Sequence, residues 1–292
     1  MQILLNGLIS GLSIALLAVA FQIVYLPTRI FFIGLAGLYA VAPYVGMTIQ
    51  QTFGLWPISM VASVAAVVAL SAAFEWANHA PLTRKNASEG AHLVSSLGLY
   101  ILLVQLVAML WGNDVKTLRT GLDATYHPFR PLDDSVLTGS QLFMFGGSVV
   151  LLAGFLVMLR TTDLGLRLRA LADNPIQFAL YGYNVNIHRL FAFGLAGVFA
   201  TAAALLTAYD IGFDPHTGLH ATLLAVVAVI IGGRSSFVGP IVGGLLLGVI
   251  RAQVVWHFSA RWQDAATFVV LALFLLLRPQ GLFGQKTRIE AT

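Results

Sequence analysis

The sequence contains no cysteine, so disulfides, thiolate nucleophiles and cysteine-ligated metal sites are excluded. Charge is also scarce: only 10% of the 292 residues are Asp, Glu, Lys or Arg, whereas a soluble domain usually carries about 25%. Hydrophobic residues make up 58% of the chain. Too little polar surface remains to cover a water-exposed globule, and we therefore expect the apolar surplus to face lipid.

A nucleotide-binding loop is missing as well. Such a loop needs a Gly-rich turn followed by Gly-Lys-Ser/Thr, and none of the lysines follows a glycine: Lys85, Lys116 and Lys286. Any ATP-driven step must therefore use another subunit. The basic residues lie singly between apolar runs, which is typical of membrane topology signals rather than of a nucleic-acid-binding patch.

Groups for catalysis or metal binding are equally sparse. His216 and His220 are four residues apart, but no carboxylate or third ligand stands near them in the sequence. No Ser-His-Asp or paired-carboxylate arrangement stands out. We therefore expect neither an enzyme nor a bound cofactor or metal.

Long apolar runs dominate the chain. A membrane-spanning helix needs about 20 mostly apolar residues. The sequence predicts about nine such helices, with eight or ten still open because the run at 218–232 is short: 3–25, 31–50, 55–77, 92–111, 141–160, 188–209, 218–232, 237–256 and 264–278. We expect an all-α integral membrane protein, a polytopic bundle in one transmembrane domain over residues 1–292.

Charges in the connecting segments predict the orientation. Lys and Arg are in excess in the segments 78–90, 160–187 and 232–239 and in the C-terminal tail, which carries Lys286 and Arg288. The positive-inside rule places these segments in the cytoplasm. Segments 112–140 and 210–217 then lie outside, together with the amino terminus.

The loop 161–187 is predicted to contain a short capped helix. Asn174 can cap its start, Pro175 suits its first turn, and Gly182 can end it in a left-handed conformation. A helix of about seven residues is only about 10 Å long and is unstable alone in water. Its apolar side chains must be buried by something: Ile176, Phe178, Ala179, Leu180 and Tyr181. Either it docks on an ATPase subunit as a coupling helix, or it packs on its own membrane domain or at the lipid headgroups.

A glycine-rich segment follows the run at 218–232. Glycines flank a short polar turn and continue at near i, i+4 spacing into the next apolar run: Gly232, Gly233, Gly239, Gly243 and Gly244. This pattern favours a tight reversal and close packing of two helices over a substrate site.

Three ionisable residues lie near membrane depth. Charges within a bilayer are rare and often functional. Glu75 and Asp210 stand near the ends of their runs, so we expect them to reach an interface and to have structural roles. Arg251 lies inside its run and could extend its guanidinium outward to the interface.

Three motifs together resemble the permeases of branched-chain amino acid ABC importers. The first is Ala170-Leu171-Ala172-Asp173-Asn174-Pro175 followed by Gly182, which is similar to that family's coupling loop. The second is the Gly-rich turn, Gly232-Gly233-Arg234-Ser235-Ser236-Phe237-Val238-Gly239-Pro240-Ile241-Val242-Gly243-Gly244. The third resembles the family's carboxy-terminal signature, Arg278-Pro279-Gln280-Gly281-Leu282-Phe283-Gly284.

The resemblance implies a non-catalytic permease subunit of an ATP-binding cassette importer in the bacterial inner membrane. It implies transport of amino acids, with branched-chain ones expected first, or of similar small polar solutes. The implied partners are a second homologous permease, two cytoplasmic ATPases that use ATP, and a periplasmic substrate-binding protein. The residues implied to couple to the ATPase are Asp173, Asn174, Pro175, Ile176, Phe178, Leu180, Tyr181 and Gly182.

One segment departs from the family pattern. Relatives often carry an Asn-Phe-Ala-His-Gly-like stretch at the start of the second membrane segment. Here residues 29–37 read Arg-Ile-Phe-Phe-Ile-Gly-Leu-Ala-Gly, without the polar Asn and His. The corresponding wall is therefore expected to be almost wholly apolar.

Two other functions remain open on the residues alone. A self-sufficient secondary transporter or channel would need an ion or proton site at membrane depth. A membrane enzyme would predict that His216 and His220 are essential for turnover.

Overall fold

A computed structural model describes residues 2–118, 129–132, 135–137 and 139–284. The helices and strands, in chain order, are α1 (Gln2–Thr28), α2 (Gly34–Phe53), α3 (Trp56–Phe74), the π-helical turn η1 (Glu75–His79), α4 (Ala80–Arg84), α5 (Glu89–Trp111), β1 (Phe129–Leu132), β2 (Ser135–Leu137), α7 (Gly139–Thr161), α8 (Asp163–Asp173), α9 (Pro175–Leu180), α10 (Val185–Asp210), α11 (Thr217–Gly232), α12 (Gly239–His257), the 3₁₀ turn η2 (Ala260–Trp262) and α13 (Gln263–Leu277).

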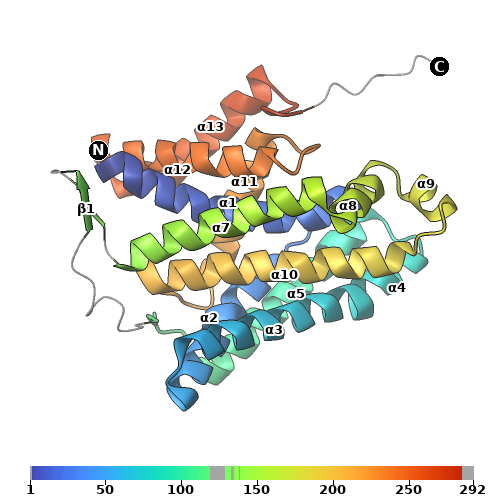
Figure 1. The fold of residues 1–292 in the computed structure, drawn as a ribbon, viewed down its shortest axis with the longest axis horizontal. Helices are drawn as coiled ribbons and strands as arrows, with labels where there is room; N and C mark the ends of the chain where they lie inside the picture. The colour runs from blue at the N-terminus through green and yellow to red at the C-terminus, as the bar shows by residue number, and fades with distance from the viewer. Residues whose placement is uncertain (1, 119–128, 133–134, 138, 285–292) are drawn as a thin grey trace.

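Each of the nine predicted apolar runs forms a helix (Figure 1). In lipid, backbone N–H and C=O groups must be satisfied within the chain, and a helix does this in every turn. Within the described residues, seven helical segments are long and apolar enough to cross a membrane. The short run forms α11, whose 16 residues span about 24 Å, less than the ~30 Å of a hydrocarbon core. The only described strands, β1 and β2, form one antiparallel pair.

Helix α1 lies at the centre of the bundle. It packs against α12, α10 and α11, and its middle residues, such as Leu16 and Ile23, are fully buried. Glycines allow its closest approach to α12: a Cβ on Gly244 would collide with Ala15, and one on Gly248 would collide with Gly11. Backbone-to-backbone packing of this kind is how membrane helices associate without a hydrophobic driving force.

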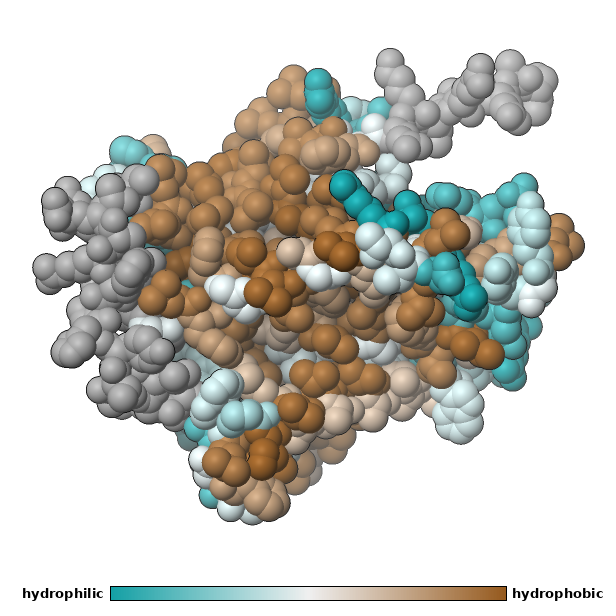
Figure 2. All heavy atoms as spheres, in the orientation of Figure 1, coloured by the Kyte–Doolittle hydropathy of each residue, from teal (hydrophilic) through white to brown (hydrophobic). Residues whose placement is uncertain are grey.

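The two ends of the bundle differ in chemistry. Figure 2 shows apolar side chains over the middle of one face and hydrophilic ones gathered at the end where α8 and α9 lie. Figure 1 places α4, α8 and α9 at that end, and the start of α1 and the strand β1 at the other. This arrangement agrees with the predicted cytoplasmic placement of 78–90 and 160–187. The tail charges Lys286 and Arg288 lie outside the described residues.

Candidate functional site

Short-range hydrogen bonds hold α9 at both ends. The Oδ1 atom of Asn174 accepts from the backbone N–H groups of Ile176 and Gln177, each at 3.0 Å. Pro175 occupies the first turn, where its missing N–H leaves no bond unmade. Gly182 follows the helix with a φ of +85°. The capped helix predicted from the sequence is therefore confirmed.

Three large apolar side chains of this segment are exposed. The exposed fraction is 75% for Ile176 and 82% for both Leu180 and Tyr181. Helix α9 lies at the polar end of the bundle (Figure 1), and the described part of the chain does not bury these side chains. The alternative in which the whole helix packs on its own membrane domain does not match this exposure.

Phe178 differs from the other apolar residues of α9. It is only 3% exposed, because its ring stacks on Tyr183 at 5.0 Å between centroids and meets His188 edge-on at 4.9 Å. The predicted coupling set thus divides in two: Phe178 anchors α9 to its own chain, and its ring is not on the outer face. Asp173, which ends α8, is exposed.

Helix α8 forms the platform for α9. The Thr162 hydroxyl caps it by accepting from the Gly165 backbone N–H at 3.1 Å. A Cβ on Gly165 would collide with the backbone of Leu159, so this sharp turn out of α7 requires glycine. Leu168 and Leu171 are buried, and the Arg167 guanidinium lies 5.1 Å from the centre of the Tyr183 ring. Helices α8 and α9 therefore form one cross-braced unit.

A buried ion pair lies directly behind this unit. Next to His188, Arg189 donates from Nε to Oε1 of Glu75 at 2.7 Å and from Nη2 to Oε2 at 3.3 Å. The two residues are 7% and 2% exposed. The expectation that Glu75 reaches an interface is therefore wrong, because Arg189 on α10 supplies a bidentate partner in the interior. The pair ties the start of α10 to η1.

The apolar segment 29–37 meets the same region. Phe32 is fully buried, with its ring 4.9 Å from that of Phe193 and 5.5 Å from that of His79. His79 in turn lies against His92 of α5, with 3.2 Å between the two Nδ1 atoms. These contacts, together with the ion pair, link the start of α10 to η1, to α5 and to the segment that precedes α2.

The glycine-rich turn and the carboxy-terminal motif, which are 45 or so residues apart, pack together. Backbone N–H groups of Leu282 and Phe283 donate to the carbonyls of Ile231 and Gly232, each at 2.9 Å. Gly233 and Gly281 have φ values of +112° and +77°, and their backbones lie in direct contact. These bonds close the turn between α11 and α12 against the tail.

Close helix packing follows the turn, as the glycine pattern predicted. A Cβ on Gly239 would collide with Gly232, and one on Gly243 would collide with Ala228. From α1, the fully buried Gln22 donates through Nε2 to the carbonyls of Arg234 and Ser236 at 2.8 and 3.0 Å. The whole glycine set therefore serves packing.

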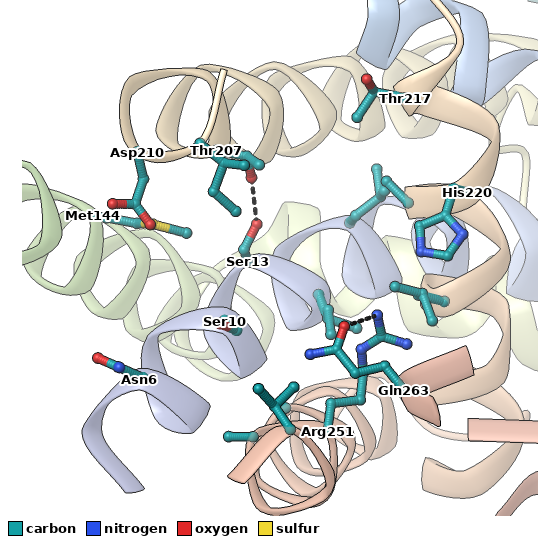
Figure 3. A pocket seen from close by; sticks show the side chains of 18 of the residues that line it. Asn6, Ser10, Ser13, Met144, Thr207, Asp210, Thr217, His220, Arg251 and Gln263 are labelled. Atoms are coloured by element: carbon teal, nitrogen blue, oxygen red, sulfur yellow. Dashed lines mark hydrogen bonds between the residues drawn. The ribbon is translucent and has the colours of Figure 1, made fainter. Parts of the chain in front are cut away.

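A cavity of about 550 Å³ opens at the other end of the bundle (Figure 3). It lies between α1, α10, α11 and α12, with Gln263 of α13 at its edge. Its polar lining comprises Asn6, Ser10, Ser13, Tyr39, Thr207, Asp210, Thr217, His220, Arg251 and Gln263. Its apolar lining includes Ile14, Leu17, Met144, Leu224 and Val255. Such a size and mixture are typical of small-molecule sites.

Arg251 of α12 turns toward the start of α13. It donates from Nη1 to Asp264 at 3.0 Å and to Thr267 at 2.9 Å, and from Nη2 to Gln263 at 3.2 Å. Its side chain is 13% exposed, and the side chain of its partner Asp264, near the start of α13, is 57% exposed. Asp210, the last residue of α10, lines the cavity on another side.

Sequence reasoning missed Arg189 and Gln22 as structural residues. Arg189 carried a usable signal, because a charge inside an apolar run demands a buried partner and Glu75 was available. Gln22 carried none, since its two acceptors are backbone carbonyls more than 200 residues away. The two histidines that are four residues apart have different surroundings: His220 lines the cavity, whereas the backbone N–H of His216 donates to Oδ1 of Asp214.

Comparison with known proteins identifies relatives along nearly the whole chain. The family described as branched-chain amino acid transport system / permease component matches residues 3–277. The high-affinity branched-chain amino acid transport system permease protein BraD of Pseudomonas aeruginosa is 28% identical over 98% of this chain and 96% of its own. LivH of Escherichia coli, a permease protein of the same description, is 24% identical over the same shares.

A more distant relative is the autoinducer 2 import system permease protein LsrC of an Enterobacter species. It is 29% identical over 82% of this chain and 68% of its own length. No solved structure matches the chain significantly.

Proposed function

The chain belongs to the family of branched-chain amino acid transport permease components, and from that premise we propose that it forms half of the channel of an ATP-driven importer. A second, homologous permease completes the channel. Two cytoplasmic ATPases energise it, and a periplasmic binding protein delivers the solute. The chain itself hydrolyses no ATP, because it lacks a phosphate-binding loop.

The exposed apolar face of α9 is the observation that carries this proposal. Ile176, Leu180 and Tyr181 are exposed, and α9 lies at the polar end of the bundle. Burying a side chain of this size stabilises a contact by about 1.5–3 kcal/mol. A rigid helix with three such groups fits an apolar groove on a soluble motor subunit.

Motion of α9 reaches the membrane through its anchor. Phe178 is packed on His188, and the neighbouring Arg189 holds Glu75 of η1. A push on α9 therefore moves the start of α10 together with η1, because packed interfaces shift between discrete arrangements rather than deform continuously. Closure of the ATPases would thus select between outward-open and inward-open channels.

Amino acids are the proposed solutes. Two of the named relatives are described as branched-chain amino acid permeases, and the cavity combines charged groups with an apolar wall. The binding protein supplies most of the selectivity, and the channel must release what it takes up.

The test is ATP-driven uptake by the reconstituted importer. We expect Ile176→Asp and Leu180→Asp each to lower leucine uptake by at least about tenfold and to weaken co-purification of the ATPase, since a buried unpaired charge costs several kcal/mol. Val115→Asp is the matched control, because Val115 is 71% exposed at the opposite end.

Normal uptake by both α9 variants would overturn the coupling assignment. Gradient-driven uptake by the chain alone, insensitive to ATP, would instead indicate a secondary transporter.

A further inference from the structure

Two opposite charges face each other across the cavity. Figure 3 shows Asp210 on the α10 side and Arg251 on the α12 side, with the space of the cavity between them. The wall that joins them is apolar and includes Ile14, Leu17 and Leu224. A ligand that matched this cavity would carry an anionic group, a cationic group and an apolar body.

The Arg251 guanidinium is held in position but retains donors. A guanidinium has five N–H donors, and the bonds described for Arg251 use three of them, on Asp264, Thr267 and Gln263. Nε–H and one Nη2–H remain for a ligand, and two parallel donors of this kind suit a carboxylate. Because α13 already fixes the side chain, little rotamer entropy is lost on binding.

Hydroxyl groups line the opposite wall near Asp210. Ser13 and Thr207 share a hydrogen bond of 2.7 Å between α1 and α10, and Ser10 and Asn6 lie one and two turns further along α1 (Figure 3). Together with the Asp210 carboxylate they offer acceptors to an ammonium group. Asp210 is fixed at the end of α10, where Gly212 follows with a φ of +100°.

We propose that this cavity is a transit site for a zwitterionic α-amino acid with an apolar side chain. Arg251 binds the carboxylate, Asp210 binds the ammonium group, and the apolar wall receives the side chain. That the amino acid passes through this cavity during import rests on the proposed function. It names the residues that would select amino acids among the small solutes a permease could carry.

We expect this site to bind the amino acid weakly. The Asp264 carboxylate, 3.0 Å from Nη1 and 57% exposed, already offsets part of the Arg251 charge, and His220 lies 3.6 Å from the same carboxylate. A solute in a channel must leave as well as enter. A pre-existing partner for Arg251 lowers the free-energy cost of releasing the carboxylate.

The experiment compares three probes on the purified importer without binding protein or nucleotide. The probes are L-leucine, 4-methylpentanoate, which lacks the ammonium group, and 3-methylbutylamine, which lacks the carboxylate. Fluorescence of Trp256, which lines the cavity, reports binding, and Trp256→Phe identifies its signal. We expect leucine to bind at least about tenfold more tightly than either probe, because each lost charged hydrogen bond is worth that factor or more.

Two variants then assign the charges. Arg251→Gln should reduce leucine affinity about tenfold, to that of the amine, and leave amine binding unchanged. Asp210→Asn should reduce leucine affinity to that of the acid and leave acid binding unchanged. The matched controls are Arg261→Gln and Asp114→Asn, exposed residues outside the cavity lining, which should change no affinity.

Three outcomes would overturn the site: no binding of leucine at any soluble concentration, equal affinity for all three probes, or an equal loss for all three in the variants. The last would mean that Arg251 only ties α12 to α13. Failure of ATP-driven uptake in the complete importer, with leucine still bound in the cavity, would count against the proposed function and not against this site.

Discussion

The α8–α9 unit and the cavity lie at opposite ends of the same bundle and are built in opposite ways. In the unit, partners are close in sequence: Asn174 caps the residues two and three positions later, and Phe178 packs on residues five and ten positions later. In the cavity, Ser13 bonds to Thr207, 194 residues away. One end is a local structure, and the other exists only when the whole bundle is assembled.

This difference predicts different consequences of damage. Loss of a local contact should open only the α8–α9 unit, because the rest of the bundle does not depend on it. Loss of a long-range contact should weaken the whole bundle, including the cavity. The buried Glu75–Arg189 pair lies next to the α8–α9 unit, so its loss tests whether a contact there affects only the unit or the whole bundle.

Arg189→Met should be the most destabilising change. It leaves the Glu75 carboxylate buried without its partner, and breaking a buried pair in this way costs about 3–5 kcal/mol. The midpoint of unfolding by SDS, measured in detergent micelles, should fall for the whole chain. The double variant Glu75→Met with Arg189→Met should recover most of the loss, since two apolar residues of similar volume can replace a buried pair.

A wild-type unfolding midpoint for Arg189→Met would show that the pair contributes nothing to global stability. The pair would then belong to the local α8–α9 unit, and this unit would include the start of α10 and η1.

Gly248→Val should be next in size. A Cβ at this position would collide with the backbone of Gly11, and forcing extra methyl groups into a packed crossing costs about 3 kcal/mol. Because Gly248 also lines the cavity, leucine binding there should fall together with the unfolding midpoint. Gly98→Val is the matched control, since nothing lies within 4 Å of a Cβ built on Gly98; an equal loss in both variants would contradict packing as the cause.

The same local and long-range division explains what the sequence could predict. The nine helices follow from apolar runs, seven of which give described helical segments long enough to cross a membrane. The caps of α9 follow from Asn174, Pro175 and Gly182, whose roles are set by near neighbours. The glycine crossing of α11 and α12 was readable because Gly232 and Gly239 are close in the chain. These features need no knowledge of which helices meet.

One sequence does not show which side chains on different helices contact each other. Glu75 was expected to reach an interface because it stands near the end of its apolar run, whereas its partner lies 114 residues away. The partners of Arg251 were equally hard to foresee, because they lie 12 to 16 residues away on α13. The exposed face of α9 was only partly predicted, because the ring of Phe178 turns inward onto Tyr183.

Phe178→Ala should act locally. Removing the ring takes away the stacking on Tyr183 and His188, a loss of roughly 2 kcal/mol in a small cluster that can partly collapse. Amide hydrogen exchange in residues 175–182 should become about thirtyfold faster, while exchange in α1 and the SDS midpoint stay unchanged. Leu180→Ala, on the exposed face, serves as the control and should leave exchange as it is; faster exchange in α1 of the Phe178 variant would contradict a local role.

Asn174→Ala should have the smallest effect and is the sharpest test of locality. It removes the acceptor of two backbone N–H groups, and loss of such a cap costs about 1 kcal/mol. Exchange at Ile176 and Gln177 should accelerate about fivefold, and ATP-driven uptake should fall modestly because α9 is folded less of the time. Asn174→Asp keeps the oxygen acceptor and should restore both. If the cap variant instead lowered leucine binding in the cavity, the two ends would be energetically coupled in the resting protein, and α9 would have to be treated as part of the bundle rather than as a local unit attached to it.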